Sequence, residues 1–421
     1  MEKHQQKDVK NRTFKQDSKA VEQKPDSSKQ TPHRVSNKAV ITGGAGHFGF
    51  SLGRALAKSG TNVILYDVNQ PLWEIPKGVV LVQADVRNYD DLFAACEGAD
   101  CVFHTASYGM TGTEQLHKKH IRAVNVGGTG VVLEVCKRRN IPRLIYTSSI
   151  NVVFAGQAII DGDEASVPYY PLNKHVNEYS KTKSIAEQMV LAANGSFLAG
   201  GGKLYTCALR APGIYGPEEQ RHMPRLASKI ESGQFAFKLG SPDVLMNWVH
   251  VENLVQAHIL AAEALTPEKN YIAGGQVYFI HDDEKVKLLE WLTPLFDGLG
   301  VRKPLIRVPI CLVHLSAVIM EIVLTLLTPI VELTPPINIH EVHNVAYTHT
   351  FKIDKARLHL GYAPKKYTFA DSVEYYLKNR HRRQSHFWLK FFLLMVFLIG
   401  VLVVFVKFPE VLKLSVKILS E

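Results

Sequence analysis

A glycine-rich turn between an apolar run and an amphipathic segment constrains this chain more than any other stretch. Gly43, Gly46 and Gly49 follow the apolar residues 39–41 and precede an amphipathic segment over residues 50–58. A strand, a glycine turn and a helix start in this order direct free backbone N–H groups and the helix dipole at a phosphate. Glycine suits the turn because it adopts positive φ and lets the backbone approach a ligand closely. The motif predicts a phosphate-binding turn, with an ordinary tight turn as the alternative.

A second predicted strand, residues 62–67, ends in the carboxylate of Asp67. An acidic group about 20 residues beyond such a glycine accepts hydrogen bonds from the ribose hydroxyls of NAD and repels the 2′-phosphate of NADP. No arginine or lysine stands in the next several positions to accept that phosphate. The pattern therefore favours NAD over NADP as the cofactor. The alternative is that Asp67 opens a surface turn.

Strand-like and helical patterns alternate from residue 37 onward. The strand-like runs are 39–42, 62–67, 79–83, 101–106, 143–148 and 204–210, and the helical stretches include 51–59, 89–97, 120–139 and 179–195. Continuous apolar strands are typical of a parallel sheet that helices cover on both faces. We therefore predict an α/β fold with a Rossmann-like, doubly wound parallel sheet over residues 37–300 and a smaller C-terminal substrate lobe over 301–376.

Ligands of such sheets bind at the carboxyl ends of the strands, and several side chains stand there. Asp85 and Val86 follow the third strand, where the carboxylate is placed to reach an adenine amino group. Thr105 and Ala106 end the fourth strand with small side chains that let a cofactor lie close. For each residue the alternative is an ordinary loop position.

Tyr179 and Lys183 are four residues apart on one face of a predicted helix. A phenol has an unperturbed pKa near 10, and a nearby ammonium group favours the phenolate, which can then act as a base. The hydroxyls of residues 147–149 end a predicted strand, where one can donate a hydrogen bond to the substrate oxygen. Asn125 lies in a predicted helix and is a candidate to hold a water in a proton relay, with a helix-surface amide as the alternative.

Together these motifs resemble an extended short-chain dehydrogenase/reductase, and within that group the 3β-hydroxysteroid dehydrogenase/isomerase family. The segments that carry the resemblance are 42–49, 67, 85–86, 125–129, 146–149, 179–183, 191–195, 204–210 and 275–280. The similarity spans roughly residues 37–375, and segments 107–110 and 184–188 resemble the 42E branch of the family.

The resemblance implies NAD(P)-dependent oxidation of a sterol 3β-hydroxyl, with Tyr179 as the base and Lys183 on the nicotinamide ribose. It assigns the hydroxyl role to Ser149, with Ser148 as second choice, and it keeps Asn125 as the relay residue. The cofactor would contact Gly43, Gly46, His47, Phe48, Gly49, Asp67, Asp85, Val86, Thr105, Ala106, Lys183, Pro212 and the neighbouring Arg210 and Gly213.

The resemblance also points to the second lobe. Residues 248–251 would lie near the substrate lobe. An isomerase step needs an acid and a base over the steroid rings, for which Tyr278 and Asp282 are the candidates. A strand-end aspartate is more often structural, so we do not predict isomerisation.

Charge and cysteine content narrow the classes of function. The net charge of +10 is concentrated at the ends, with +5 from residues 1–38 and a second basic cluster at 378–390. No basic stripe interleaved with aromatics crosses the middle, so we expect no nucleic-acid binding. The five cysteines are scattered without a C-x-x-C pair, which gives no support for a metal site.

The N-terminal segment is polar, whereas the C-terminal segment is apolar. Residues 1–36 are polar and predict a disordered tail. Residues 391–406 are uncharged, and with Phe387, Trp388 and the flanking Lys390 and Lys407, whose side chains can snorkel, they give a stretch of spanning length. This predicts a transmembrane helix over 387–408, after a basic linker over 377–390 and before a short tail over 409–421. Residues 308–331 are apolar around Glu321 and predict a segment that dips into the membrane interface, with a second span as the alternative.

We therefore expect a membrane-anchored enzyme, placed in the endoplasmic reticulum with its catalytic domain facing the cytosol. Its partners would be a lipophilic sterol or steroid substrate and membrane lipid, and a homodimer is left open. Three alternatives remain: a sterol-4α-carboxylate 3-dehydrogenase, a nucleotide-sugar epimerase-like enzyme that shares the Ser/Tyr/Lys set, and a non-catalytic NAD-binding membrane scaffold.

Overall fold

The computed structural model describes residues 37–110, 112–233, 235, 237–239, 243–304, 307–308 and 339–380. The predicted tail over 1–36, the transmembrane helix over 387–408, the tail over 409–421 and most of the segment 308–331 lie outside the described residues. Of the linker over 377–390, only residues up to 380 are described. Across the described ranges, no helix is long and apolar enough to cross a membrane.

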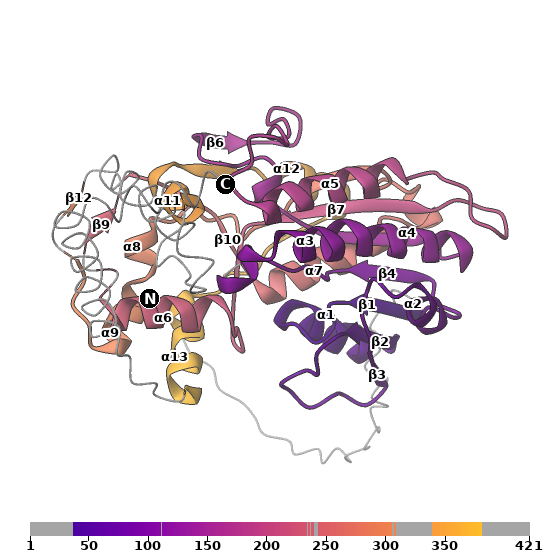
Figure 1. The fold of residues 1–421 in the computed structure, drawn as a ribbon, viewed down its shortest axis with the longest axis horizontal. Helices are drawn as coiled ribbons and strands as arrows, with labels where there is room; N and C mark the ends of the chain where they lie inside the picture. The colour runs from indigo at the N-terminus through magenta and orange to yellow at the C-terminus, as the bar shows by residue number, and fades with distance from the viewer. Residues whose placement is uncertain are drawn as a thin grey trace, which may run out of the picture. The chain divides into compact units, whose positions relative to one another are not determined.

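The described chain contains a seven-stranded parallel sheet in the order β11-β7-β5-β4-β1-β2-β3. Figure 1 labels β7, β4, β1, β2 and β3 of this sheet one below another. Its strands are β1 (Lys38–Thr42), β2 (Asn62–Asp67), β3 (Val79–Gln83), β4 (Cys101–His104), β5 (Arg143–Ser149), β7 (Tyr205–Ala211) and β11 (Gln276–Phe279). From β1 the chain first adds β2 and β3 on one side, and then adds β4, β5, β7 and β11 on the other side. The point at which the order of addition reverses therefore lies between β1 and β4. This confirms the predicted Rossmann-like α/β fold, and the six predicted strands match their observed bounds within two residues.

Alternation of apolar residues along the strands builds one core on each face of the sheet. In β1, Ala39 and Ile41 contribute to the core beneath α1 (His47–Lys58), α7 (Val251–Glu263) and α12 (Asp354–Leu360). Val40, between them, faces the core beneath α2 (Tyr89–Ala95), α4 (Thr129–Arg138) and α5 (Glu178–Ala192). Because successive side chains point to opposite faces, a continuously apolar strand is buried on both sides.

The helix predicted over 120–139 is divided in the structure. It consists of α3 (Lys118–Arg122), a π-helical turn (Ala123–Gly128) and α4. The turn packs closely on the loop after β3, where a Cβ on Gly128 would lie 2.7 Å from Val86 Cγ1. Single π turns inside helices are frequent at functional sites. Here the turn contains Asn125.

A second, smaller core gathers short elements beyond the sheet. Aromatic and aliphatic side chains of α6, α9 and α13 pack around Tyr215 and Trp248. The remaining elements are η1 (Gly112–Leu116), η3 (Ile150–Val152), β6 (Ile159–Gly162), β8 (Gly213–Tyr215), α6 (His222–Glu231), β9 (Lys238–Leu239), β10 (Trp248–His250), η4 (Pro267–Lys269), α8 (Leu288–Trp291), α9 (Thr293–Leu299), β12 (Arg307–Val308), α11 (Ile339–Ala346), β13 (His349–Phe351) and α13 (Phe369–Asn379).

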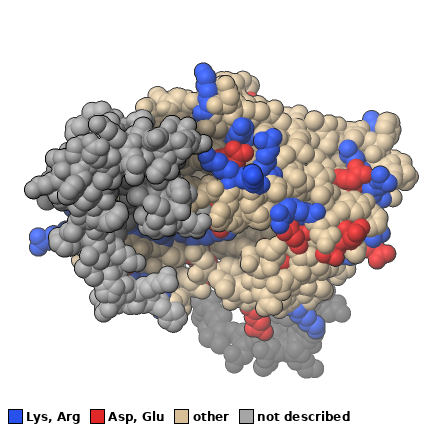
Figure 2. Space-filling view, in the orientation of Figure 1, with Lys and Arg blue, Asp and Glu red and all other residues tan. Residues whose placement is uncertain are grey.

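Acidic and basic side chains lie beside one another on part of the face shown in Figure 2. Surface ion pairs among the described residues include Arg138 with Glu134 at 2.7 Å and Arg87 with Asp85 at 2.5 Å. Exposed pairs of this kind contribute little to stability, because solvent screens them. The fold is held by its buried cores.

Candidate active site

The glycine turn after β1 has a conformation that other residues cannot adopt. Gly43 has φ of +74°, and a Cβ there would lie 2.7 Å from the backbone nitrogen of Ala106. A Cβ on Gly49 would overlap the carbonyl oxygen of Gly43. The turn is therefore a cradle in which the backbone itself forms the surface.

Helix α1 starts at this turn and leaves its N-terminus free for an anion. The helix begins at His47, four residues before the predicted start, with Gly46 as N-cap; no side chain caps it and its first turn contains no acidic residue. Such a start presents N–H groups and a positive dipole end, which fits the diphosphate of a dinucleotide. His47 donates from Nε2 to the carbonyl of Pro217 at 2.8 Å, and Phe48 is buried in the core below.

Asp67 lies beside the same turn. Its Oδ2 accepts a hydrogen bond from the Ala45 N–H at 3.1 Å, and its Oδ1 accepts from the Asn69 N–H at 2.9 Å. The carboxylate therefore closes the end of β2 against the glycine turn. This is the place at which a ribose-binding carboxylate is needed, and its contact with a ribose stays a prediction.

The other predicted cofactor residues divide into two groups. Thr105 donates to the Thr42 carbonyl at 2.7 Å and Ala106 abuts Gly43, so the structure brings the turns after β1 and β4 together. Asp85 is instead held by Arg87, and the hydrogen bond from that guanidinium lowers the pKa of the carboxyl group.

Val86 packs on the π turn, and Pro212 lies between β7 and β8. Gly213, the next residue, allows the Trp248 ring to approach, since a Cβ there would overlap that ring. The adenine contact of Asp85 and the cofactor contacts of Val86 and Pro212 stay predictions.

Tyr179 and Lys183 are buried on α5, which begins at the cap formed by Asn177. Lys183 is 2% exposed and donates from Nζ to the Thr147 carbonyl of β5 at 2.5 Å. The same Nζ lies 4.1 Å from the centroid of the Tyr146 ring. Strand β5 thus fixes the lysine with one carbonyl and one ring face, while other N–H donors of the ammonium remain for a ligand.

Burial shifts the two pKa values in opposite directions. It raises the pKa of Tyr179 to about 12, against the lowering effects of a hydrogen bond with Ser107 and the charge of Arg221. It lowers the pKa of Lys183 to about 7, and the charge of Glu187 acts in the opposite direction. The sequence argument predicted a phenol whose pKa is lowered by the lysine. The pKa of Tyr179 is instead raised, because desolvation outweighs the nearby charges.

The two serines at the end of β5 differ in their surroundings. Ser148 is 4% exposed, lies opposite Arg210 in the register of β5 and β7, and has no hydrogen-bond partner for Oγ among the described residues. Ser149 is half-buried at the strand end, where its Oγ accepts from the Asn151 N–H at 3.2 Å and caps η3. Ser149 is the more accessible of the two to a substrate at the carboxyl end of the sheet.

Asn125 is buried, and its side-chain amide is engaged by protein groups. Its Oδ1 accepts from the Tyr108 N–H at 2.8 Å, and its Nδ2 donates to the Tyr108 carbonyl and to Thr182 Oγ1, each at 3.0 Å. Its backbone carbonyl accepts from Thr129 Oγ1 at 2.6 Å. The alternative of a surface amide is therefore wrong. The side chain ties the loop after β4 to α5, and the water-holding role stays a prediction.

The roles of several residues of the site were missed by the sequence analysis. His104 is fully buried, with Nδ1 2.7 Å from Thr42 Oγ1 and Nε2 2.9 Å from Thr129 Oγ1, and burial lowers its pKa to about 3. Ser107 and Arg221 act on Tyr179, and Glu187 acts on Lys183. Glu187 was detectable, since it stands four residues after Lys183; the others are brought in by the fold.

The isomerase candidates are held by structural contacts. Tyr278 is fully buried, with its hydroxyl 3.2 Å from His359 Nδ1. Asp282 accepts hydrogen bonds from the His250 N–H at 3.0 Å and from Asn253 Nδ2 at 2.7 Å. These contacts hold Asp282 between β10, α7 and β11, in accord with a structural aspartate.

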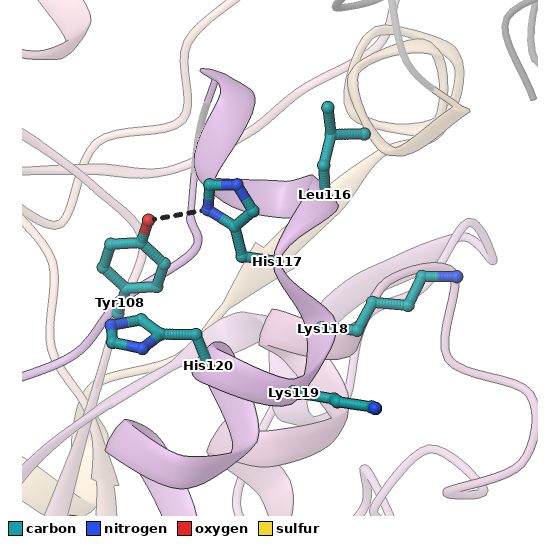
Figure 3. A pocket seen from close by; sticks show the side chains of 6 residues that line it. All are labelled: Tyr108, Leu116, His117, Lys118, Lys119 and His120. Carbon is teal, nitrogen blue, oxygen red and sulfur yellow. Dashed lines mark hydrogen bonds between the residues drawn. The ribbon is translucent and has the colours of Figure 1, made fainter. Parts of the chain in front are cut away.

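A hollow of about 660 Å³ lies beside the loop that Asn125 fixes (Figure 3). Its lining consists of Tyr108, Leu116, His117, Lys118, Lys119 and His120. In Figure 3 the Tyr108 hydroxyl meets His117 Nδ1, at 3.1 Å, while both lysine side chains point away from the ring. A second hollow in the smaller core, among Tyr215, Trp248 and Trp291, measures only about 10 Å³, which is about the room needed for one water.

Comparison with known proteins agrees with this arrangement. The family described as the 3-beta hydroxysteroid dehydrogenase/isomerase family matches residues 40–310. Short-chain dehydrogenase/reductase family 42E member 1 of Homo sapiens is 49% identical over 358 residues, which cover 84% of this chain and 91% of that protein. The 3beta-hydroxysteroid-dehydrogenase/decarboxylase isoform 1 of Arabidopsis thaliana is 36% identical over 290 residues, 68% of this chain and 63% of that protein.

More distant solved structures share the fold. The dTDP-glucose 4,6-dehydratase DesIV from Streptomyces venezuelae, a double mutant solved with NAD and DAU bound, matches with a TM-score of 0.61 at 19% identity, covering 81% of this chain and 97% of the other. The UDP-glucose 4-epimerase of Thermus thermophilus, in complex with NAD, has a TM-score of 0.59 at 18% identity, covering 82% and 100%. The chain belongs to the 3-beta hydroxysteroid dehydrogenase/isomerase family, within the extended short-chain dehydrogenases/reductases.

Proposed function

We propose that this protein uses NAD to oxidise the 3β-hydroxyl of a sterol or steroid. The observation that carries the proposal is the burial of Tyr179 and Lys183 on one face of α5, with Lys183 fixed to the end of β5. The glycine cradle and the uncapped start of α1 fit a dinucleotide diphosphate, and Asp67 beside them favours NAD over NADP. Family membership supports the choice of a 3β-hydroxyl.

In this reaction Tyr179 removes the proton of the substrate hydroxyl, while Ser149 donates a hydrogen bond to the same oxygen. Lys183 holds ribose hydroxyls with the N–H donors that Thr147 does not use. Bound NAD would supply the hydride acceptor and a positive charge, and that charge would favour the phenolate of Tyr179. Ser107 and Arg221 act on Tyr179 in the same direction, which opposes the effect of burial.

We place the enzyme at a membrane, in the endoplasmic reticulum, with the catalytic domain on the cytosolic side. The support is the sequence of residues 387–408 and of the basic linker before it. A membrane anchor suits a lipophilic substrate, because the substrate then reaches the site from the bilayer. We therefore include membrane lipid among the partners of this protein, and we leave open whether it forms a homodimer.

A second candidate is the oxidation of a sterol that carries a carboxylate next to its hydroxyl. The side chain of Arg221 is 53% exposed, and its acidic neighbour Glu114 is 3.9 Å away. Its charge lowers the pKa of Tyr179, which supports a position near the base for a substrate carboxylate that pairs with Arg221. A relative named as a dehydrogenase/decarboxylase favours the same chemistry, because a β-keto carboxylate readily loses carbon dioxide.

The test is NADH formation by the full-length, detergent-solubilised protein. Neutral 3β-hydroxysterols, a sterol 4α-carboxylate and UDP-glucose are supplied in parallel with NAD, beside the variant Tyr179→Phe. Tyr205→Phe is the matched control, since that ring stacks on Tyr271 away from the helix α5 face.

Turnover of a neutral sterol that only Tyr179→Phe abolishes supports the first candidate, and turnover confined to the carboxylate supports the second. Epimerisation forms no net NADH, so conversion of UDP-glucose is followed by chromatography of the nucleotide sugar. Conversion of UDP-glucose alone would replace both candidates with an epimerase-like activity. NAD binding without turnover of any sterol would leave the non-catalytic scaffold.

A further inference from the structure

A buried ion pair lies beneath the catalytic helix. Glu187 of α5 is fully buried and Arg210 of β7 is 2% exposed. Arg210 Nη2 lies 2.7 Å from Glu187 Oε1, and its Nε lies 3.1 and 3.2 Å from the two carboxylate oxygens. Tyr169 donates its hydroxyl to Oε1 at 2.6 Å. Removing two charges from water is costly, and a well-packed apolar pair is often at least as stable, so stability alone is a weak reason for this arrangement.

The spacing of Glu187 connects it to the catalytic lysine. Residues 179, 183 and 187 are separated by four and therefore share one face of α5. The charge of Glu187 raises the pKa of Lys183 against the lowering effect of burial. Of the other described titratable groups that face Lys183, His104 is neutral and fully buried, and Tyr146 and Tyr179 are phenols. Glu187 therefore supplies the negative charge on this side of the ammonium.

Arg210 and Tyr169 fix the position of the Glu187 carboxylate. Together they occupy both oxygens of the Glu187 carboxylate. The carboxylate is thus fixed one helical turn away, and the ammonium of Lys183 donates to the Thr147 carbonyl instead. Lys183 gains a favourable charge without giving up the donors that a ligand would use.

We propose that Glu187, held by Arg210, is a positioning residue that keeps Lys183 charged and so sets the pH range over which the protein binds NAD. The inference rests on the proposed function only in its choice of cofactor. It makes Glu187 part of the electrostatics of the site, although Glu187 contacts neither substrate nor cofactor.

The experiment measures NAD affinity by titration calorimetry of the full-length protein between pH 6 and 9. The variants are Glu187→Gln and the double variant Glu187→Gln with Arg210→Met, which removes both buried charges. Glu164→Gln is the matched control, because that half-buried carboxylate lies near Arg210 and accepts from the Phe279 N–H, with no effect on Lys183. Circular dichroism verifies the fold of each variant.

Wild-type affinity is expected to fall as pH rises through the range in which Lys183 loses its proton. In Glu187→Gln and in the double variant the fall begins at a lower pH, so the affinity at pH 8 is about tenfold weaker than that of the wild type. At pH 6 the difference is about twofold or less. Glu164→Gln follows the wild-type curve.

Superimposable curves for the wild type and either folded variant would overturn the inference. A wild-type NAD affinity that does not change between pH 6 and 9 would also overturn the inference. This result needs no variant, so it applies even if a variant fails to fold. The expected curves without turnover of any sterol would refute the proposed function and leave this inference standing. No NAD binding by the wild type would overturn both.

Discussion

His281 gives a quantitative test of the described packing that is independent of function. It lies two residues after the end of β11, is 3% exposed, and donates from Nε2 to the Phe351 carbonyl at 2.8 Å. Its Nδ1 accepts from the Asp283 N–H at 3.0 Å. A carbonyl only accepts and a backbone amide only donates, so these contacts require the neutral ring with its proton on Nε2. A second proton would break the bond from Asp283 and bury a charge.

The size of the effect follows from the two pKa values. Burial lowers the pKa of His281 to about 4 in the folded protein, whereas an unfolded histidine has a value of about 6.5. The unfolded state therefore binds more protons between these values, and the stabilisation present above pH 6.5 is lost as the pH falls towards 4. Each pH unit in this window is worth about 1.4 kcal/mol, so the loss is about 2 kcal/mol at pH 5.

The assay is urea unfolding of the full-length protein, followed by tryptophan fluorescence at pH 7.5 and pH 5. The wild type and His281→Gln are compared by how much unfolding free energy each loses between the two pH values. The variant is expected to lose about 2 kcal/mol less than the wild type. His120→Gln, at an exposed position, should lose as much as the wild type. Equal losses for His281→Gln and the wild type would refute the buried neutral ring.

Three further predictions concern the candidate site. Ser149→Ala should lower kcat for the preferred sterol by about 100-fold, because it removes a donor to the reacting oxygen, whereas Ser148→Ala should change kcat less than about threefold. Gly49→Ala should weaken NAD binding at least about tenfold, measured by calorimetry, since its Cβ would force the Gly43 carbonyl to move. Asp67→Ser should reduce the ratio of NAD to NADP affinity at least about tenfold, because it removes the charge that repels a 2′-phosphate. An unchanged kcat in Ser149→Ala would contradict the role of that hydroxyl. An unchanged NAD affinity in Gly49→Ala, or an unchanged ratio of affinities in Asp67→Ser, would likewise contradict the role of that residue.

The features that could be predicted from the sequence are those that depend on residues close together in the chain. The apolar runs of β1 and β2 and the glycines between them are consecutive in the chain, so their order alone indicates a phosphate-binding turn. The position of Asp67 follows in the same way, because a strand end two elements later in a parallel sheet lies at the same edge. Tyr179 and Lys183 are likewise local, since four residues bring them onto one helix face.

Other features depend on contacts between segments distant in the sequence. The helix predicted over 120–139 contains a π turn, because residues 123–128 must fit against the loop after β3. Arg210 resembled a cofactor neighbour by its place just before Pro212 at a strand end, yet its side chain is directed to Glu187 of α5. Neither the π turn nor the direction of the Arg210 side chain can be predicted from hydrophobic periodicity, because both depend on which helix packs on which strand.

The pKa values of the site show why tyrosine and lysine have separate partners. A cationic cofactor ring beside the site would favour the phenolate of Tyr179 and, for the same electrostatic reason, oppose the ammonium of Lys183. Burial lowers the pKa of Lys183 to about 7 even against the opposing charge of Glu187. A lysine that must stay charged there needs a negative neighbour that does not act equally on the phenol. Glu187 lies one turn from Lys183 and two turns from Tyr179, while Ser107 and Arg221 act on Tyr179. The eight-residue separation of Tyr179 and Glu187 thus allows the two proton affinities to be set independently.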